Sequence, residues 1–439
     1  MVKYCFFLFS LIFVYSAFAL PPDFGGSLQN GTTVVCQSPV PELRQMDTLS
    51  GWLSQTFGSC TLTLQASGTF SYNDGEVSFV PSVDVLSFSG HFPISLFDFH
   101  LLEFMVGRTY FGDSSGYVLS SNLDGGSVGL HASEYKVELA LAYSGLQSGT
   151  LKLSLADNAT TDSYFSLPGR LMGLAQVEFY NLLEHHFLGS VIVQQDLNEW
   201  APGTDMVSAG DGQFLRGVGG VVNTQYLNLE VRGQLGGLLF YEVFASLGTG
   251  SSLLYHDLVY KDVPLLSFLG SLEVVLSQKQ WLNSLWIMRL LYSSGDSWDN
   301  RSAYFEASEA LVEPDFTHQF IPLTRSRLAL LFSPRLGNIW YSSVAYSFKP
   351  LAKLQGEIVA STFFRSQQGP VAITNTRNGS NASYLGSEVD VSANFSLLPD
   401  VGLAVSGGLF FPANGTGGLF EEERDSMEWL FTVYGSLSF

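Results

Sequence analysis

The residues with the clearest chemical potential are few and scattered along the chain. His185 and His186 form the only adjacent histidine pair, and they directly follow Glu184. A metal site or an acid–base reaction would need further ligands or partners, and none is recognisable around this pair. The other histidines stand alone, and no Ser–His or Asp–His signature of a hydrolase is visible. The sequence therefore predicts no catalytic site, no metal site, no cofactor and no enzyme activity.

The cysteines offer one candidate cross-link. Cys36 and Cys60 lie beyond the hydrophobic start of the chain, which holds the third cysteine, Cys5. In an exported protein such a pair can form a disulfide, and Cys36 and Cys60 are the candidate pair here. The alternative is that both remain thiols.

Charged residues at alternate positions are the third group with a possible role. Tyr135, Val137 and Leu139 are apolar, whereas Lys136 and Glu138 between them are charged. Side chains of a strand alternate between its two faces, so the charges would share one face and the apolar residues the other. An inner face carrying both signs predicts a water-filled lumen. The candidate pore-lining residues are Glu134, Lys136, Glu138, Glu230, Arg232, Lys353, Glu357, Arg365, Glu388 and Asp390.

The elements that would carry these residues are strands. The same alternation recurs in residues 227–234, 353–365 and 388–397. The chain is 46% hydrophobic and only 14% charged, yet no stretch after residue 20 has 18 uninterrupted apolar residues. A hydrophobic chain without spanning helices leaves the closed β-barrel as its membrane architecture, since lipid requires every backbone group to be paired internally. A soluble β-sandwich would also alternate, but with more charge on its wet face.

We therefore predict an all-β fold, a transmembrane antiparallel β-barrel of about 14 to 18 strands. Its 44 glycines, 35 phenylalanines and 19 tyrosines suit tight turns and aromatic girdles. Termini in the periplasm and long external loops complete the expectation, which places the protein in a bacterial outer membrane.

Both ends of the chain fit an exported barrel. Lys3 precedes an apolar run that ends in the small-residue site Ala17–Phe18–Ala19, so residues 1–19 are predicted to be a signal peptide. At the other end, Trp429, Phe431, Leu437 and Phe439 lie on one face of the last predicted strand. This end of the chain resembles the last strand of bacterial outer-membrane β-barrels, and the resemblance makes these four residues the candidate signal for the barrel assembly machinery. Residues 20–58 are expected to be irregular, as a periplasmic lead-in or a plug, and residues 59–439 to form the barrel.

The net charge is −20, with 40 acidic and 20 basic residues. Nucleic acid is excluded as a partner because no basic patch is present to meet phosphates. The run Glu421–Glu422–Glu423 with Asp425 could bind cations that bridge lipopolysaccharide-like glycolipid, or could be a solvated loop. Membrane lipid and small solutes are the other expected partners. The sequence leaves open whether the barrel is a monomer or a homo-oligomer.

Counting strands back from the end gives a long external excursion at 294–338. It exceeds what an ordinary hairpin loop needs, so we expect it to fold partly into the barrel mouth and narrow the pore. Its candidate constriction residues are Arg301, Arg325, Arg327 and Arg335. The alternative is that the excursion covers the outer surface, and deletion of residues 299–324 would distinguish the two.

Three short motifs in the last third resemble the alginate-export-type porins. They are Tyr384–Leu385–Gly386–Ser387–Glu388–Val389–Asp390–Val391, the strand end Gly407–Gly408–Leu409–Phe410–Phe411–Pro412, and Leu290–Leu291–Tyr292–Ser293–Ser294–Gly295–Asp296. The resemblance implies a barrel of about 16 to 18 strands and solute passage. That family lines its pore with cationic residues, whereas this chain is acidic, which argues against alginate as the solute.

The function predicted from the sequence is a porin-like outer-membrane channel for passive diffusion of small hydrophilic solutes. Two other readings stay open: a surface adhesin or structural barrel acting through its external loops, and a transporter of hydrophobic compounds. The latter would need an apolar region inside the barrel together with a lateral or plugged route.

Overall fold

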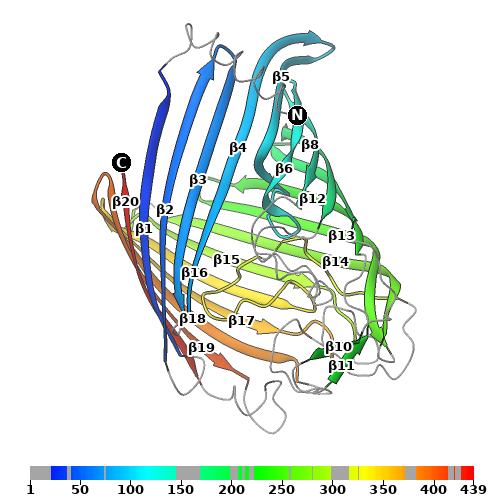
Figure 1. Ribbon diagram of the computed structural model, residues 1–439, viewed down its shortest axis with the longest axis vertical. Coiled ribbons are helices and arrows are strands. Elements are labelled where there is room, and N and C mark those ends of the chain that lie inside the picture. The colour runs from blue at the N-terminus through cyan, green and yellow to red at the C-terminus, as the bar shows by residue number, and fades with distance from the viewer. Residues whose placement is uncertain are drawn as a thin grey trace.

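The protein is a closed antiparallel β-barrel of 18 strands, as seen in a computed structural model (Figure 1). The structure describes residues 21–36, 41–73, 76–144, 169–197, 206–209, 213–216, 222–256, 259–278, 280–297, 316–324, 326–369, 371, 382–413, 420 and 427–439. Each barrel strand pairs with its neighbours in sequence, and β1 pairs with β20 to close the sheet. The predicted all-β barrel is confirmed, and its 18 strands fall within the predicted range.

The barrel strands are β1 to β9 and β12 to β20, and β10 with β11 forms a separate two-stranded sheet. Their bounds are β1 Asp23–Cys36, β2 Glu42–Phe57, β3 Cys60–Asn73, β4 Glu76–Leu96, β5 Phe99–Gly112, β6 Ser120–His131, β7 Tyr135–Tyr143, β8 Arg170–Leu182, β9 His185–Asp196, β10 Met206–Ala209, β11 Gln213–Arg216, β12 Asn223–Leu235, β13 Leu239–His256, β14 Val259–Gln278, β15 Ser284–Ser293, β16 Trp340–Leu351, β17 Leu354–Phe364, β18 Tyr384–Leu398, β19 Val401–Pro412 and β20 Glu428–Ser438.

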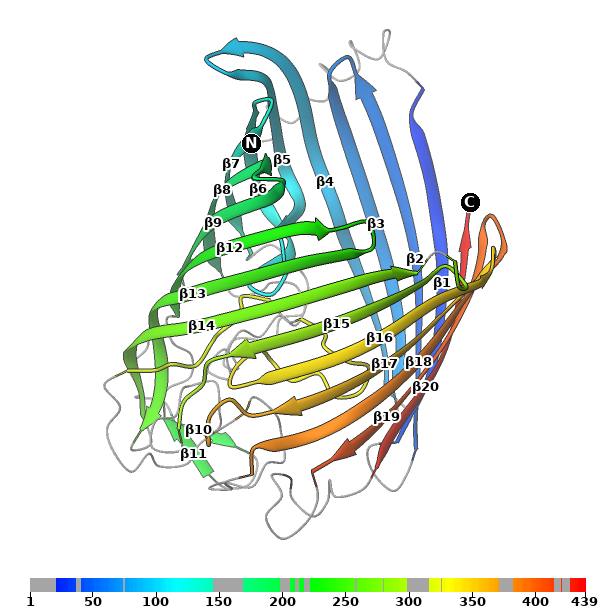
Figure 2. The same ribbon diagram turned by 180° about the vertical axis from the view of Figure 1, so that it is seen from behind.

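The two ends of the barrel differ in the length of their connections. Tight turns at one end join β2 to β3, β4 to β5, β8 to β9, β16 to β17 and β18 to β19. The long connections, including the one from β15 to β16, leave from the opposite end (Figure 2). Short turns face the periplasm in transmembrane barrels, so we call these the periplasmic end and the external end. The start of β1 and Phe439 meet at the periplasmic end, where Gly26 and Phe439 exchange backbone hydrogen bonds of 2.8 and 3.0 Å.

The outer wall is apolar and the inner wall is mostly polar. On β12, Leu229 is 57% exposed on the outside, whereas its neighbour Glu230 is 2% exposed. Phe431 and Leu437, from the predicted assembly signal, also lie on the exposed outer face, and Phe439 is exposed beside them. The described part of the chain holds no helix long and apolar enough to cross a membrane.

The prediction for residues 20–58 is wrong, because this part of the chain forms β1 and β2. Thirteen register pairs join the two strands, from Asp23↔Ser54 to Val35↔Glu42. Alternation is hard to recognise here because glycine and asparagine occupy many outward positions, such as Gly26 and Asn30 beside Leu28. The barrel therefore begins at Asp23. Residues 1–19, predicted as the signal peptide, lie outside the described residues.

The predicted disulfide between Cys36 and Cys60 is also wrong. Cys36 ends β1 at the external end, and Cys60 begins β3 after the periplasmic turn. The length of β2 separates them, and at ~3.3 Å per residue its 16 residues span roughly 50 Å. A disulfide needs Cα atoms within about 7 Å, so no bridge can join the two cysteines in this fold.

Candidate functional site: the lumen of the barrel

One side of the inner wall is lined with hydroxyl and amide groups. The inward positions of β20, β1, β2 and β3 alternate with exposed apolar residues such as Leu28 and Leu49. Neighbouring hydroxyls pair across the strands, as in Ser27 with Ser50 at 2.7 Å. Along the middle of these four strands no described charged side chain faces inward. We call this surface the hydroxyl arc: Ser27, Gln29, Thr33, Thr48, Ser50, Thr63, Gln65, Ser67, Thr69, Thr432 and Ser436.

The opposite side of the wall carries a band of charges, which we call the charged arc. It runs from β5 to β15 near the periplasmic end and is held together by ion pairs within and between strands. Lys136 Nζ lies 2.7 Å from Glu138 on the same strand, and Arg289 Nε of β15 lies 2.5 Å from Glu273 of β14. The members of the charged arc are Glu103, His131, Lys136, Glu138, Glu178, His186, Glu230, Arg232, Glu242, Glu273 and Arg289.

His186 links two parts of the charged arc. Arg232 Nε donates to His186 Nδ1 at 3.0 Å, and His186 Nε2 lies 2.6 Å from Glu178 Oε1. Arg232 also lies 3.2 Å from Glu230. His186 and Arg232 line a pocket of about 400 Å³ together with Glu242 and Glu273. With six glutamates against one lysine and two arginines, the charged arc favours cations over anions.

The structure brings only some of the predicted pore-lining residues into the open lumen. Lys136, Glu138 and Arg232 lie partly exposed on the charged arc, and Glu357 also faces inward, on β17. Glu230 lies on the same arc, but its neighbours cover it and it is only 2% exposed. The five remaining predicted residues, considered in turn below, occupy turns, connections or covered positions.

Glu134 and Lys353 are not lining residues, because each lies in a periplasmic turn. The Glu134 carbonyl accepts from Tyr180 N at 2.9 Å, and Lys353 Nζ donates to the Leu397 carbonyl at 3.0 Å. Arg365 follows β17 and is buried, where it donates to the carbonyl of Gly369 at 2.8 Å. The alternation was extended too far in all three cases, since a turn breaks the strand period.

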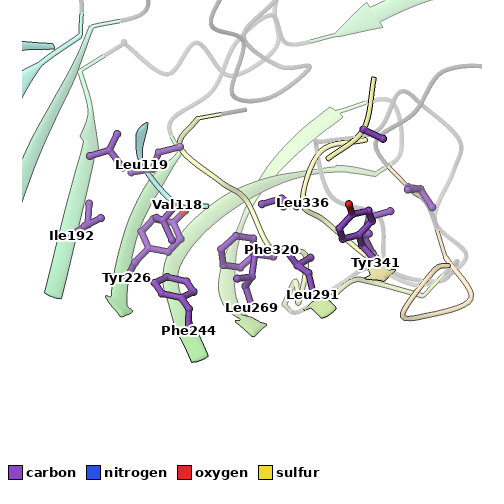
Figure 3. Close-up of a cluster of buried hydrophobic side chains, with 14 of the residues drawn as sticks. Val118, Leu119, Ile192, Tyr226, Phe244, Leu269, Leu291, Phe320, Leu336 and Tyr341 are labelled. Carbon is purple, nitrogen blue, oxygen red and sulfur yellow. The ribbon is translucent and has the colours of Figure 1, made fainter. Parts of the chain in front are cut away.

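The excursion between β15 and β16 enters the barrel, as the strand count predicted. We call its described residues 316–324 and 326–339 the lumen segment. Its apolar side chains Phe320, Leu323 and Leu336 are fully buried, and they pack against inward-facing residues including Tyr226 and Phe244 (Figure 3). Tyr226 also donates a hydrogen bond to the Ile321 carbonyl. The lumen segment thus fills part of the barrel cross-section with an apolar cluster.

Two acidic residues of β18 hold the far part of the lumen segment. Leu331 N donates to Glu388 Oε1 at 2.7 Å, and Phe332 N donates to Glu388 Oε2 at 2.7 Å. Leu330 N donates to Asp390 Oδ2 at 3.3 Å. Glu388 and Asp390 therefore face inward as predicted, but the segment covers them, and they bind backbone N–H groups in place of solutes.

Glu388 and Asp390 form a clamp on the lumen segment, and stacked rings reinforce this clamp. The Phe332 ring stacks on Phe410 of β19 with centroids 4.4 Å apart, and it meets Phe363 of β17 edge-on at 4.8 Å. Gly386 on β18 has a φ of 152°. A Cβ there would lie 2.6 Å from the Phe410 ring, so a glycine is needed for this packing.

A second connection completes the apolar cluster. Residues 113–119, between β5 and β6, turn inward, and Leu323 N donates to the Val118 carbonyl at 2.8 Å. Asp113 shapes this loop by accepting from Val118 N at 3.0 Å and from Leu119 N at 2.5 Å. Burial raises the pKa of Asp113 above its ordinary value, although its hydrogen bonds oppose this shift.

Of the four candidate constriction arginines, Arg301 and Arg325 lie outside the described residues. Arg327 donates to the carbonyls of Ala329 and Leu330 within its own segment, at 3.2 and 2.9 Å. Arg335 is half-buried near the end of the lumen segment. The described part of the constriction is therefore mainly apolar. The prediction that arginines form its contacts stays untested for Arg301 and Arg325.

Asp296 anchors the entry of the lumen segment. It accepts hydrogen bonds from the Thr317 hydroxyl and from His318 N, the latter at 2.6 Å. Thr317 in turn pairs with the edge of β14, since its amide donates to the Pro264 carbonyl at 2.9 Å. Burial raises the pKa of Asp296 to about 6, while its hydrogen bonds and the His318 imidazole oppose the shift.

We expect low pH to stabilise the contact between Asp296 and the lumen segment. A buried carboxyl with a raised pKa favours the protonated form, so its contribution to stability is greatest below the ordinary value near 3.8 and is lost as pH rises through about 6. The protonated acid keeps an oxygen that accepts from His318 N. Conductance measured in planar bilayers should therefore fall as pH drops from 7 to 5. Asp296→Asn should flatten this dependence, and an unchanged profile would refute the anchor role.

Several lumen residues escaped the sequence analysis. Glu242, Glu273 and Arg289 each stand between apolar neighbours in β13, β14 and β15. A single charge inside an apolar run is the signal that could have placed them on the inner wall. The acidic residues 421–423 and 425, and most of the loops proposed for adhesion, lie outside the described residues. No group of His, Cys, Asp and Glu among the described residues could hold a metal ion.

Comparison with known proteins finds a likeness to solved structures only. No family model matches the chain, and no curated protein matches it. Among solved structures, the chain is similar to OccK2 (OpdF) of Pseudomonas aeruginosa at TM-score 0.53 and 11% identity, covering 95% of this chain and 97% of that one. It is also similar to the outer membrane protein OpdK of the same organism, at TM-score 0.52 and 12% identity, covering 95% and 99%. These likenesses show the fold alone.

Proposed function

We propose that the protein is a porin-like outer-membrane channel for passive diffusion of small hydrophilic solutes. The observation that carries this proposal is the division of the inner wall of an 18-stranded barrel into a hydroxyl arc and a charged arc. A barrel of this size encloses more space than its own wall side chains fill. The lumen segment occupies part of that space, which leaves the passage to run along the hydroxyl arc and past the charged arc.

The proposed solutes are neutral or cationic. The hydroxyl arc offers donors and acceptors without charge, so uncharged polar solutes can exchange hydrogen bonds with water for hydrogen bonds with the wall. The charged arc has an excess of carboxylates, so cations should be enriched at the periplasmic mouth. The fold of the Pseudomonas porins supports a channel, and the short motifs shared with alginate-export-type porins support a relationship to that family.

Membrane partners belong to the same proposal. The apolar outer face would contact lipid and lipopolysaccharide-like glycolipid, and the last strand would present Trp429, Phe431, Leu437 and Phe439 to the barrel assembly machinery. The proposal does not require a second copy of the chain.

Reconstitution into planar bilayers tests the channel directly. Stepwise conductance is expected, and its absence from correctly folded barrels would refute the function. Heat-modifiable gel migration provides the check on folding.

Glu242 offers a test of the charge preference. It lies on the charged arc between the strands that carry Glu230 and Glu273, so Glu242→Lys changes the local charge by two units. The cation-to-anion permeability ratio, read from the reversal potential in a salt gradient, should fall several-fold. Asp400→Lys, in the turn between β18 and β19, changes the charge by the same two units and should leave the ratio unchanged. If both variants have the same permeability ratio, the charged arc does not determine the ion selectivity.

A further inference from the structure

The barrel wall has a seam between β4 and β5. From the periplasmic turn outward, β4 pairs with β5 as far as Leu86↔Arg108, and the described pairing ends there. β4 nevertheless continues to Glu76, and along this part β3 is the only described strand that pairs with it. β5 continues to Gly112, where β6 is its only described partner. In Figures 1 and 2, β4 runs on toward the external end past the point where β5 stops.

The backbone is built to diverge at this point. Gly107 immediately precedes the last paired residue of β5 and has a φ of 126°. A Cβ on Gly107 would lie 2.0 Å from the Leu86 carbonyl oxygen, so only glycine fits. On β4 the register with β3 shifts between Val83 and Val85, which is a β-bulge at Asp84. A bulge bends a strand and increases its twist. The backbones of β4 and β5 therefore each turn away from the other at this point.

Side chains of β5 and β6 hydrogen-bond to β4 at the start of the seam, and we call these contacts the latch. Arg108 Nη1 donates to the Val83 carbonyl at 2.9 Å, and Asn122 Nδ2 donates to the Asp84 carbonyl at 3.1 Å. Arg108 is itself held by Asp124 through two bonds, of 2.9 and 2.7 Å. These polar residues alternate with inward-facing Thr109 and Leu123, so they lie on the outer face, which is mostly apolar. The latch satisfies two carbonyls that β5 would otherwise pair.

The surroundings of the seam are apolar on both sides of the wall. Outside, Val77, Phe79 and Val83 on β4 are 62%, 64% and 41% exposed. Inside, Phe111 and Leu123 beside the seam belong to the apolar cluster that includes the lumen segment. An open sheet edge is not tolerated in lipid, so the edge groups of β4 that no described residue pairs must meet water or another polar group.

From this geometry we propose that the seam is a lateral portal through which amphiphilic molecules pass between the lumen and the outer leaflet. Such a molecule has a polar head and an apolar tail. Its head can bond to the open β4 edge and the latch, while its tail stays against the apolar rim and the internal cluster. This role goes beyond axial diffusion and does not depend on it. The Arg108–Asp124 pair controls the width of the portal.

The first test compares reactivity and transport at the seam. In a background with serine at positions 5, 36 and 60, Val83→Cys should react with a membrane-impermeant polymer maleimide at least several-fold faster than Val344→Cys. Val344 is 47% exposed on the outer face of β16, which pairs with both its neighbours. Labelling of Val83→Cys should slow influx of N-phenyl-1-naphthylamine in cells, while influx of a hydrophilic β-lactam, followed by periplasmic hydrolysis, stays unchanged.

Equal reactivity of the two cysteines, or unchanged naphthylamine influx after labelling, would overturn the portal. Loss of β-lactam influx without any effect on the naphthylamine probe would support the axial channel and refute the portal.

The second test opens the latch. Arg108→Ala with Asp124→Ala removes both partners, so no charge is left unpaired, and naphthylamine influx should rise several-fold. Glu42→Ala with Arg44→Ala removes another ion pair, of 2.7 Å, on β2, a strand that takes no part in the seam, and should have no effect. A rise of the same size in both double variants, or in neither, would contradict the proposal. Heat-modifiable migration confirms that each variant is a folded barrel.

Discussion

Deleting the lumen segment should raise single-channel conductance several-fold. The chain can be shortened there because Ser293 N donates to the Ile339 carbonyl at 2.8 Å, and Tyr292 pairs with Trp340. Residues 297–336 can therefore be replaced by a short glycine linker that follows the existing strand pairing. The deletion removes Phe320, Leu323 and Phe332 with the rest of the apolar cluster's central part. Ion flow scales with the open cross-section, and this part of the lumen would then fill with water.

A shorter deletion of residues 298–315 is the matched control. It leaves the described lumen segment in place, so conductance should stay near that of the intact protein. If both deletions raise conductance equally, the obstruction lies outside the lumen segment. If neither deletion raises conductance, the ion pathway does not pass the lumen segment. The 299–324 deletion considered from the sequence should give an intermediate value, because it removes Phe320 and Leu323 but leaves the clamp at Leu331 and Phe332.

Replacing the clamp carboxylate should loosen the lumen segment without removing it. Glu388→Gln keeps one acceptor oxygen, but its amide NH2 faces one of the two backbone N–H groups that the carboxylate now binds. A buried N–H group left unpaired costs about 1–3 kcal/mol, and a bond to a charged acceptor is stronger than one to a neutral acceptor. We expect larger open-channel current fluctuations and faster proteolysis within 316–339.

Glu357→Gln is the control for the clamp, because Glu357 faces the lumen from the adjacent strand, β17. It removes the same charge from the same wall, so any effect of charge alone should appear in both variants. Matching noise and proteolysis rates in the two proteins would show that Glu388 does not hold the segment. Asp390→Asn should have a weaker effect than Glu388→Gln, since Asp390 accepts only the longer bond of 3.3 Å from Leu330.

Local periodicity made the barrel predictable. Alternation between Leu229 and Glu230, or between Val137 and Lys136, depends only on the two-residue repeat of a strand, so the inward face was assigned correctly wherever the strand continued. The same reasoning failed at Glu134, Lys353 and Arg365, where turns and connections end the repeat. It also failed for β1 and β2, where small and polar residues stand on the outer face and hide the contrast.

Chain parity placed both ends of the 294–338 excursion at the external rim, and its length beyond that of an ordinary hairpin loop predicted that it enters the barrel. The identity of its contacts could not follow from parity. Leu331 and Phe332 meet Glu388 from 57 and 56 residues away in sequence. Glu388 therefore looked like a residue facing open water, when in the fold it binds backbone amides. The disulfide prediction failed for a related reason, since nearness in sequence places Cys36 and Cys60 at opposite ends of β2.

The sequence by itself determined the class of fold, because hydrophobicity, low charge and two-residue alternation are local properties that only a membrane barrel satisfies together. Tertiary structure alone decided which inward residues meet water, since that depends on where the lumen segment lies across the barrel. It also decided where the wall parts between β4 and β5. Pairing between strands joins backbones that are distant in sequence. No local sequence pattern at Gly107 or Asp84 indicates that the pairing between β4 and β5 ends there.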